Sequence, residues 1–293
     1  MKVLIIGKTG QLARELADLD WPPSFQVRQT DRGDCDLAEP RSIRRALLTA
    51  RPDLVVNAAA CTAVDRAEAE PELAMRINGE GPAALARICA ETGAALVHIS
   101  TDYVFDGNKT AAYLEGDAVN PLSVYGRTKL AGERAIRESL ARHVIIRTSW
   151  VFSSHGNNFV KTMLRLGAQG REIRVVADQT GAPTSARDLA RAILTIATAI
   201  SAQRGVWGTF HYASAEPTSW FAFAQTIFAE SGDRLPVTVT PISSADYGGA
   251  APRPMNSVLD CPRIRDAYGI DRPSWREALT EALAEIASPE SRP

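Results

Sequence analysis

The sequence has little of what marks several classes of protein. Its 293 residues include four cysteines, Cys35, Cys61, Cys89 and Cys261, which form no CxxC pair and are joined by no histidine at metal-site spacing. We therefore expect reduced cysteines packed in the interior of a cytoplasmic protein. No apolar run approaches the roughly 18 residues that a membrane-spanning helix needs, and no signal-peptide pattern opens the chain.

The sequence also lacks an excess of charge of either sign. Lys and Arg number 33 against 34 Asp and Glu, so the net charge at pH 7 is -1. A nucleic-acid surface needs clustered Lys and Arg that neutralise a row of phosphates. The densest basic stretch, Arg41, Arg44 and Arg45, has instead the spacing of a solvated helix face. We expect no nucleic-acid partner and no membrane partner.

Short β-branched segments alternate with longer helical patterns along the chain. Strands are predicted at residues 2–7, 25–31, 53–60, 95–100 and 143–149, and weaker ones at 173–178 and 208–214. Helices are predicted near residues 11–19, 40–50, 64–91, 125–141, 157–168 and 274–287. Strands that are apolar throughout are typical of a parallel sheet covered on both faces. The predicted fold class is α/β, with a Rossmann-like doubly wound parallel sheet.

The alternation loosens after about residue 150, where Pro and Gly become frequent and residues 245–262 show little periodicity. We predict a dinucleotide-binding domain in residues 1–150 and a smaller C-terminal α/β substrate lobe in residues 151–293. Residues 173–178 and 205–214 are expected to return to the main sheet.

A glycine turn follows the first predicted strand, where Gly7 and Gly10 stand before Gln11 and Leu12. The first glycine allows a tight reversal, the second lets the backbone approach a pyrophosphate, and the following helix offers free N–H groups to the anion. A GxxGxxA pattern alone is weak and also fits a plain strand-to-helix turn. Its place after the first strand of an alternating chain favours a dinucleotide site.

The second predicted strand ends at Asp31 and Arg32, where a dinucleotide fold reads the adenosine ribose. An acid there favours the free 2′-hydroxyl of NADH, whereas an arginine accepts the 2′-phosphate of NADPH. Both are present, so the sequence leaves the cofactor open.

Two further segments are candidates for contact with the cofactor. Asp36 and Leu37 could flank the adenine, although a capped turn before the next helix is an alternative. The small residues Ala58, Ala59 and Ala60 follow the third strand and would let a cofactor lie against the backbone, or simply allow tight packing.

Tyr125 and Lys129 are one helical turn apart on the face that also carries Ile136 and Leu140, whereas Arg127 lies on the other side. An inward lysine is costly unless it is paired or used. A cation near a phenol lowers the pKa of the phenol and makes it a usable proton donor. Thr101 ends the strand 95–100 at the edge where ligands bind. We predict that Thr101, Tyr125 and Lys129 form a catalytic set.

The combined motifs resemble the extended short-chain dehydrogenase/reductase superfamily, whose members act largely on nucleotide sugars. Within it, the chain is similar to reductases of dTDP-linked keto sugars over nearly its whole length. The segments that carry the resemblance are GKTGQL (7–12), VVNAAACTAVDRAE (55–68), INGEGPAALA (77–86), HISTDYVFDG (98–107), NPLSVYGRTKLAGE (120–133), RTSWVFS (147–153), DQTGAPTSARDLA (178–190) and RPMNSVLDC (253–261).

The resemblance implies reduction of the C4 ketone of a dTDP-linked sugar, with hydride from NADPH or NADH. It implies that Tyr125 protonates the nascent alkoxide, that Lys129 lowers the pKa of Tyr125 and holds the nicotinamide ribose, and that Thr101 polarises the ketone. Two alternatives remain: a non-catalytic nucleotide-binding regulatory subunit, and an epimerase or dehydratase that recycles a tightly bound cofactor.

The resemblance also implies substrate contacts from Asp102, Trp150, Arg253 and Asn256. Without it, Trp150 would be a core residue, Asp102 a turn cap, and Arg253 and Asn256 anchors of a loop. An arginine suits a diphosphate because its guanidinium bridges two phosphate oxygens.

Some relatives dimerise through an acidic metal site, to which Glu15 could belong. Here Arg187 and Asp188 stand where two acids would be expected. Bridging magnesium is therefore doubtful, and whether the chain forms a homodimer is left open.

Overall fold

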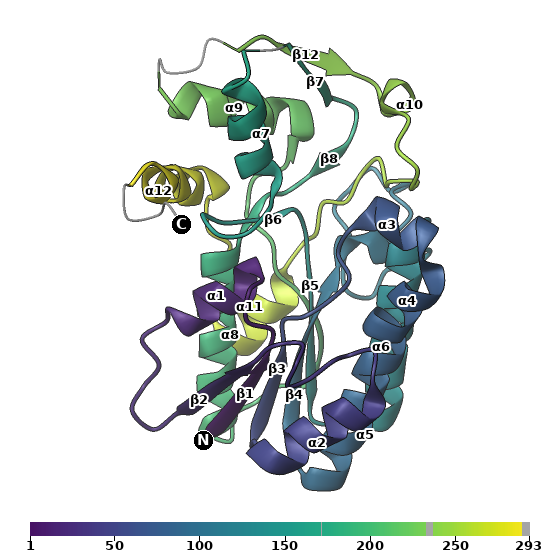
Figure 1. The fold of residues 1–293 in the computed structure, drawn as a ribbon, viewed down its shortest axis with the longest axis vertical. Coiled ribbons are helices and arrows are strands. Elements are labelled where there is room, and N and C mark those ends of the chain that lie inside the picture. Colours follow the sequence, from purple (N-terminus) through teal and green to yellow (C-terminus); the bar gives the residue numbers. More distant parts are fainter. Residues whose placement is uncertain (171, 233–236, 289–293) are drawn as a thin grey trace.

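A six-stranded parallel sheet forms the centre of the computed structural model, which describes residues 1–170, 172–232 and 237–288 (Figure 1). The strands are β1 (Lys2–Ile6), β2 (Gln26–Thr30), β3 (Leu54–Asn57), β4 (Ala95–Thr101), β5 (His143–Thr148) and β10 (Gly208–His211). Their order is β10-β5-β4-β3-β1-β2, and every neighbouring pair is parallel. The order reverses between β1 and β3, which is where doubly wound sheets bind ligands.

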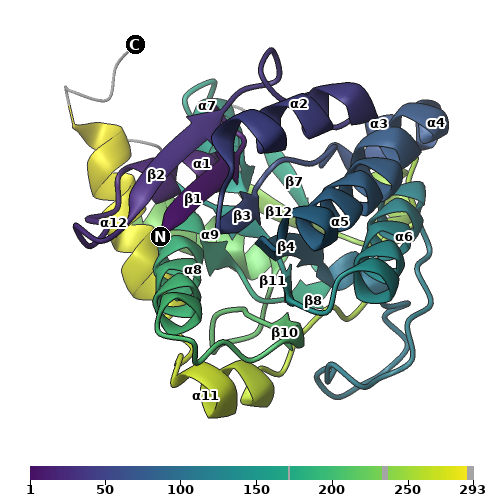
Figure 2. The same cartoon turned by 90° about the horizontal axis from the view of Figure 1, so that it is seen from below.

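Helices cover both faces of this sheet (Figure 2). One face carries α1 (Gln11–Ala17), α8 (Ala186–Ser201) and α11 (Pro262–Tyr268), and the other carries α2 (Pro40–Ala50), α5 (Gly81–Thr92) and α6 (Val124–Ser139). Along β1, Val3 and Ile5 pack into the first layer, while Leu4 and Ile6 pack into the second. Because both faces are buried, β1, β3, β4 and β5 are largely apolar, as predicted, whereas the edge strand β2 (QVRQT) is mostly polar and partly exposed.

A second core lies beyond the carboxyl ends of the strands (Figure 1). It is built by α7 (Phe159–Gly167), α9 (Trp220–Glu230), α12 (Trp275–Ala287) and the parallel pair β7 (Ile173–Val176) and β12 (Val239–Ile242). Phe223 and Trp275 are each at most 1% exposed and meet edge to face.

The remaining elements are short. They are α3 (Val64–Ala69), α4 (Pro71–Met75), a π turn (Arg76–Glu80), a 3-10 turn (Asp102–Val104), α10 (Ser244–Tyr247), β6 (Val151–Phe152), β8 (Thr180–Gly181), β9 (Thr184–Ser185) and β11 (Thr218–Ser219). Across the described ranges, no helix is both long and apolar enough to span a bilayer.

The two weak strand predictions have different outcomes. Residues 208–211 join the main sheet as β10, beside β5, as expected. Residues 173–176 do not, because β7 pairs with β12 and buries Ile173 and Val175 in the second core. The prediction that 173–178 returns to the main sheet is therefore wrong. A short apolar sequence predicts that a segment forms a strand. Its pairing partner is decided by tertiary packing, which the local sequence does not contain.

The helix predictions differ from the structure over residues 64–91, and they omit α8, α9, α10 and α11. Residues 64–91 form four consecutive elements, because Pro71 starts a new helix and the stretch Arg76–Glu80 is wound as a π turn. The long helix α8 was not predicted at all. Its buried residues Leu189, Ile193 and Ile196 have helical spacing, so the signal was present in the sequence.

Glu133 connects α6 to the sheet through a buried ion pair. The fully buried carboxylate accepts hydrogen bonds from Arg147 on β5, at 2.9 and 2.8 Å, and from Ser100 on β4, at 2.6 Å. Burial alone would raise the pKa of Glu133, but the hydrogen bonds and charge of Arg147 outweigh it and hold the pKa below its usual value. Glu133 is therefore ionised and fixes α6 on the sheet.

We expect Glu133→Ala to lower the free energy of unfolding by about 3–5 kcal/mol, because it leaves the charge of Arg147 buried and uncompensated. Urea denaturation at pH 7 measures this. Glu138→Ala, at an exposed position of the same helix, should change stability by less than about 0.5 kcal/mol.

The effect should also depend on pH. Since the folded-state pKa of Glu133 is lowered, its stabilisation is present above the ordinary glutamate pKa of about 4.3 and is lost as the pH falls below it. The difference between the wild type and Glu133→Ala should shrink in acid. A difference that is small at pH 7, or that grows in acid, would contradict this account.

Candidate active site

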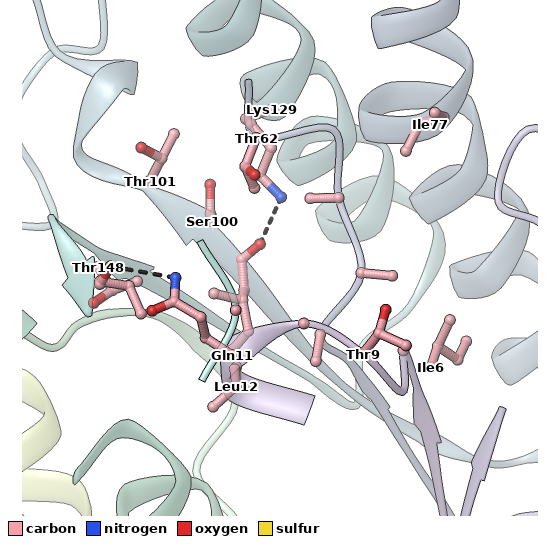
Figure 3. Close-up of a pocket in the computed structure, with 18 of the residues that line it drawn as sticks. Ile6, Thr9, Gln11, Leu12, Thr62, Ile77, Ser100, Thr101, Lys129 and Thr148 are labelled. Carbon is pink, nitrogen blue, oxygen red and sulfur yellow. Dashed lines mark hydrogen bonds between the residues drawn. The ribbon is translucent and has the colours of Figure 1, made fainter. Parts of the chain in front are cut away.

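A cavity of about 860 Å³ opens at the carboxyl ends of the strands, at the point where their order reverses (Figure 3). It is lined by residues that follow β1, β3, β4 and β5 and by the first turns of α6. The predicted residues found in its wall are Gly7, Gly10, Gln11, Leu12, Asp31, Arg32, Asp36, Leu37, Ala58, Ala59, Ala60, Thr101, Asp102, Tyr125, Lys129 and Trp150. Residues from distant parts of the chain thus meet as predicted.

The glycine turn needs Gly7 for its conformation. Gly7 has φ +117°, and a Cβ atom there would lie 3.4 Å from the Cβ of Ala13 and 3.6 Å from the backbone of Ala58. Gly10 caps α1 in an extended conformation, with no side chain bonded to the first turn and open space where a Cβ would lie. The N–H groups of the first turn therefore remain accessible to an anion.

The end of β2 presents both charges predicted from the sequence. Asp31 Oδ1 accepts the backbone N–H groups of Gly33 and Asp34, and Asp31 Oδ2 lies 4.0 Å from Lys8 Nζ. Arg32 Nε donates to Asp36 Oδ2 at 3.0 Å, while 75% of the Arg32 side chain stays exposed. Two basic groups thus flank Asp31, and Lys8 was not predicted as a site residue.

Tyr125 and Thr101 face each other at the wall of the cavity. Ser123 caps α6 by accepting the N–H of Gly126 at 3.1 Å, which places Tyr125 in the first turn. A hydrogen bond joins the side chains of Tyr125 and Thr101. Thr101 Oγ1 also donates to Asp102 Oδ1 at 2.9 Å.

Lys129 lies one turn further along α6 and is 2% exposed. Figure 3 shows the amine of Lys129 directed into the cavity wall. Its Nζ donates to the carbonyl oxygen of Ile99 at 2.6 Å and lies 3.3 Å from His98 Nε2. Burial lowers the pKa of Lys129 to about 8, although the charge of Glu133 opposes this. The inward orientation predicted for Lys129 is confirmed.

The prediction that Lys129 lowers the pKa of Tyr125 is wrong for this structure. Burial raises the pKa of the Tyr125 phenol well above its usual value, the hydrogen bond with Thr101 lowers it, and the charge of Asp102 raises it further. The Nζ of Lys129 is directed to the carbonyl oxygen of Ile99 on β4. Tyr125 is consequently protonated at neutral pH, which is the form a proton donor needs.

The far wall of the cavity is aromatic. Trp150 has φ +47°, which is unusual for a residue with a side chain, and its ring stacks on Trp220 with centroids 3.5 Å apart. A Cβ at Gly181 would lie 2.5 Å from the Trp150 ring, so the glycine leaves room for it. Trp220 also lines the cavity and was not predicted, because it lies on a helix that the sequence analysis missed.

Arg253 and Asn256 are not among the residues that line the cavity. Asn256 Nδ2 donates to the carbonyl oxygens of Lys109 and Ala111 at 2.7 and 3.0 Å, which is the loop-anchor alternative. Arg253 pairs with Asp65 at 2.7 Å and bonds to the phenol of Tyr103, a cavity residue. Arg253 thus stands one side chain behind the wall, and a substrate contact by either residue stays a prediction.

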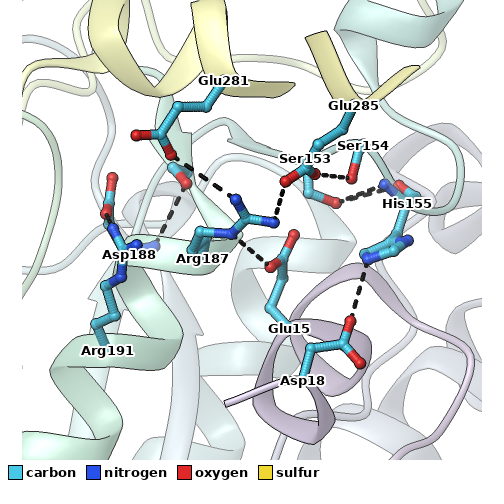
Figure 4. Close-up of polar contacts among 11 residues, drawn as sticks. Glu15, Asp18, Ser153, Ser154, His155, Arg187, Asp188, Arg191, Glu281 and Glu285 are labelled. Carbon is cyan, nitrogen blue, oxygen red and sulfur yellow. Dashed lines mark hydrogen bonds and ion pairs between the residues drawn. The ribbon is translucent and has the colours of Figure 1, made fainter. Parts of the chain in front are cut away.

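Arg187 lies among the carboxylates of α1 and α12 (Figure 4). Its guanidinium is 3.2 Å from Glu15, 3.8 Å from Glu281 and 2.5 Å from Glu285. The positive charge beside Glu15 is therefore supplied by the chain itself. In the part of the chain that the structure describes, no three His, Cys, Asp or Glu residues group as metal ligands.

Comparison with known proteins shows close relatives. The family model described as the RmlD substrate binding domain matches residues 1–288. A dTDP-4-dehydrorhamnose reductase of Sinorhizobium fredii is 42% identical over 282 residues, covering 95% of each chain. The crystal structure of a Clostridium acetobutylicum dTDP-4-dehydrorhamnose reductase has a TM-score of 0.91 at 39% identity, covering 98% of this chain and 100% of that one. The Bacillus anthracis enzyme in complex with NADP has a TM-score of 0.90 at 37% identity, covering 97% and 99%.

We expect Gly126→Ala to disturb the position of Tyr125, because a Cβ at Gly126 would lie 2.2 Å from the carbonyl oxygen of Tyr103. The overpacking should lower the free energy of unfolding by about 1–3 kcal/mol in urea denaturation. Gly116→Ala is the control, since nothing lies within 4 Å of a Cβ there. Equal stability of the two variants would show that the contact at Gly126 relaxes without cost.

Proposed function

The chain belongs to the RmlD substrate binding domain family, and we propose that it reduces the C4 ketone of dTDP-4-dehydro-L-rhamnose to dTDP-L-rhamnose, the last step of dTDP-rhamnose biosynthesis. The observation that carries the proposal is a single cavity that joins the glycine turn at Gly7 to Thr101, Tyr125 and Lys129. A protein that only binds a nucleotide has no need of a phenol beside a buried hydroxyl and a buried lysine at the end of the site.

The residues of the cavity fit a dinucleotide laid along the sheet edge. The N–H groups that follow Gly10 would hold the pyrophosphate, Asp31 and Arg32 the adenosine ribose, and Asp36 and Leu37 would flank the adenine. Ala58, Ala59 and Ala60 would lie against the cofactor. NADPH and NADH both fit this arrangement, and the two basic groups beside Asp31 favour NADPH.

A nicotinamide cofactor held by these residues would supply the hydride for C4 of the sugar. The carbonyl oxygen then gains negative charge, and Tyr125, protonated in this structure, donates its proton to that oxygen. Thr101 polarises the ketone when its proton turns from Asp102 to the substrate. Lys129, whose pKa is about 8, exchanges protons in the working pH range and would hold the nicotinamide ribose.

We assign the substrate to the far side of the cavity. Asp102 lies beside Thr101, and Trp150 offers an aromatic face to the apolar side of a pyranose. The six-stranded part, mainly residues 1–150 with β10, would be the dinucleotide-binding domain, and most of residues 151–288 the substrate lobe. A cytoplasmic location and a homodimer stay predictions.

Replacing Tyr125 with Phe removes the proton donor and should lower kcat at least about 10²-fold, with little change in stability. The assay follows loss of nicotinamide absorbance with NADPH and dTDP-4-dehydro-L-rhamnose. Tyr268→Phe is the control, because Tyr268 bonds to Val206 outside the cavity. Unchanged turnover of the Tyr125 variant would remove this residue from the proposed role.

Arg32→Ala should weaken binding of NADPH about three- to tenfold, since a charged hydrogen bond to the 2′-phosphate is lost from an exposed side chain. Binding of NADH should stay the same. Fluorescence titration measures both affinities, with the exposed Arg41→Ala as control. An equal loss for both cofactors would mean that Arg32 does not read the 2′-phosphate.

A further inference from the structure

A buried chain of polar side chains leads from the cavity wall to Lys129. Asn57 on β3 and His98 on β4 are direct neighbours in the parallel register, and they are 1% and 0% exposed. Asn57 Nδ2 lies 3.0 Å from His98 Nδ1, and His98 Nε2 lies 3.3 Å from Lys129 Nζ. These contacts occupy both ring nitrogens of His98.

The orientation of the Asn57 amide decides where His98 carries its proton. The backbone N–H of Ala59, at the cavity wall, donates to Asn57 Oδ1 at 3.3 Å, so the oxygen of the amide is directed to Ala59. The amide nitrogen therefore faces His98 and donates to Nδ1. A neutral imidazole that accepts at Nδ1 carries its proton on Nε2.

His98 is neutral because burial, together with the charge of Lys129, lowers its pKa well below the usual value. Its Nε2–H is then directed at Lys129 Nζ. A hydrogen bond forms there only with the lone pair of an uncharged amine, since an ammonium group has no lone pair to accept it. The amine can still donate to the carbonyl oxygen of Ile99.

We propose that His98 is a positioning residue for Lys129, whose uncharged amine it holds through Nε2–H, with its own tautomer fixed by Asn57. Glu133, also on α6, acts on this nitrogen, and its charge favours the ammonium form. The Nε2–H of His98, on β4, has the opposite effect and favours the uncharged amine.

The catalytic meaning of this contact rests on the proposed reduction. Tyr125 gives its proton to the sugar oxygen and becomes a phenolate. Lys129, which lines the same cavity, would supply the replacing proton through solvent there and become an amine. His98 then stabilises that amine by a hydrogen bond without losing its own proton. A proton from solvent restores the ammonium group before the next turnover.

The tautomer of His98 can be measured in the unaltered protein. The chain has four histidines, so 15N–1H correlation spectra of histidine-labelled protein are resolvable, and the His98 signal is assigned with His98→Gln. We expect the proton on Nε2. A proton on Nδ1 would overturn the inference, whatever the catalytic activity.

The effect on Lys129 can be measured in the same way. The chain has five lysines, so 13C-labelled lysine gives few signals, and Lys129→Arg identifies the one required. In His98→Gln the glutamine side chain can rotate and present its amide oxygen as an acceptor to the ammonium group of Lys129. The pKa of Lys129 should therefore rise by about one unit. His143→Gln, at a buried histidine outside the cavity, should leave it unchanged. No shift, or a downward shift, in His98→Gln would refute the inference.

Kinetics then separate the two proposals. The ammonium form must be present to replace the proton, so kcat should fall as pH rises through the pKa of Lys129, about 8. His98→Gln should move this fall to higher pH by the shift seen in the spectra. An inactive wild type would reject the proposed function and leave the tautomer result standing. An active His98→Gln with an unmoved pH profile would reject the inference alone.

Discussion

The parallel order of the six strands is the constraint on which the site depends. Because every neighbouring pair is parallel, all carboxyl ends meet at one edge, and the reversal of order between β1 and β3 leaves a gap there. The glycine turn after β1, the alanines after β3 and Thr101 at the end of β4 reach the same cavity for that reason. The second core then closes the cavity from the other side, with Trp150 and Trp220 as its wall.

The inner face of α6 carries a lysine and a glutamate, and β4 and β5 supply polar partners for both. Lys129 is matched by the carbonyl oxygen of Ile99 and the ring of His98, while Glu133, one turn later, is matched by Ser100 and Arg147. Lys129 lines the cavity, and burial lowers its pKa to about 8, so its amine can gain or lose a proton near neutral pH. Glu133 forms a buried ion pair with Arg147 that holds the helix on the sheet. One helix face thus combines an ionisable group at the cavity with a structural ion pair one turn away.

Much of the fold and the site could be predicted from local pattern. Apolar strands, the spacing of Tyr125 and Lys129 and the turn at Gly7 are short-range signals, and all of them meet in the cavity. Pairing partners are not local: nothing within residues 173–176 indicates that they pair with β12. Trp220 was missed because its helix is apolar nearly all round and offers no periodic face. The pKa of Tyr125 could not be predicted, because it depends on how deeply the phenol is buried and on where the Nζ of Lys129 is directed.

The stack of Trp150 on Trp220 links the shape of the cavity wall to the stability of the second core. Trp220 also contacts Phe159, which stacks on Phe223 in the middle of the second core, so the wall of the cavity continues without a break into the packing that stabilises the lobe. A substitution anywhere along this row changes the packing of the lobe and the shape of the cavity wall together. Evolution of the cavity shape at these aromatic residues is therefore coupled to the stability of the lobe, and a change of shape that leaves stability unaffected would have to begin at other residues of the cavity.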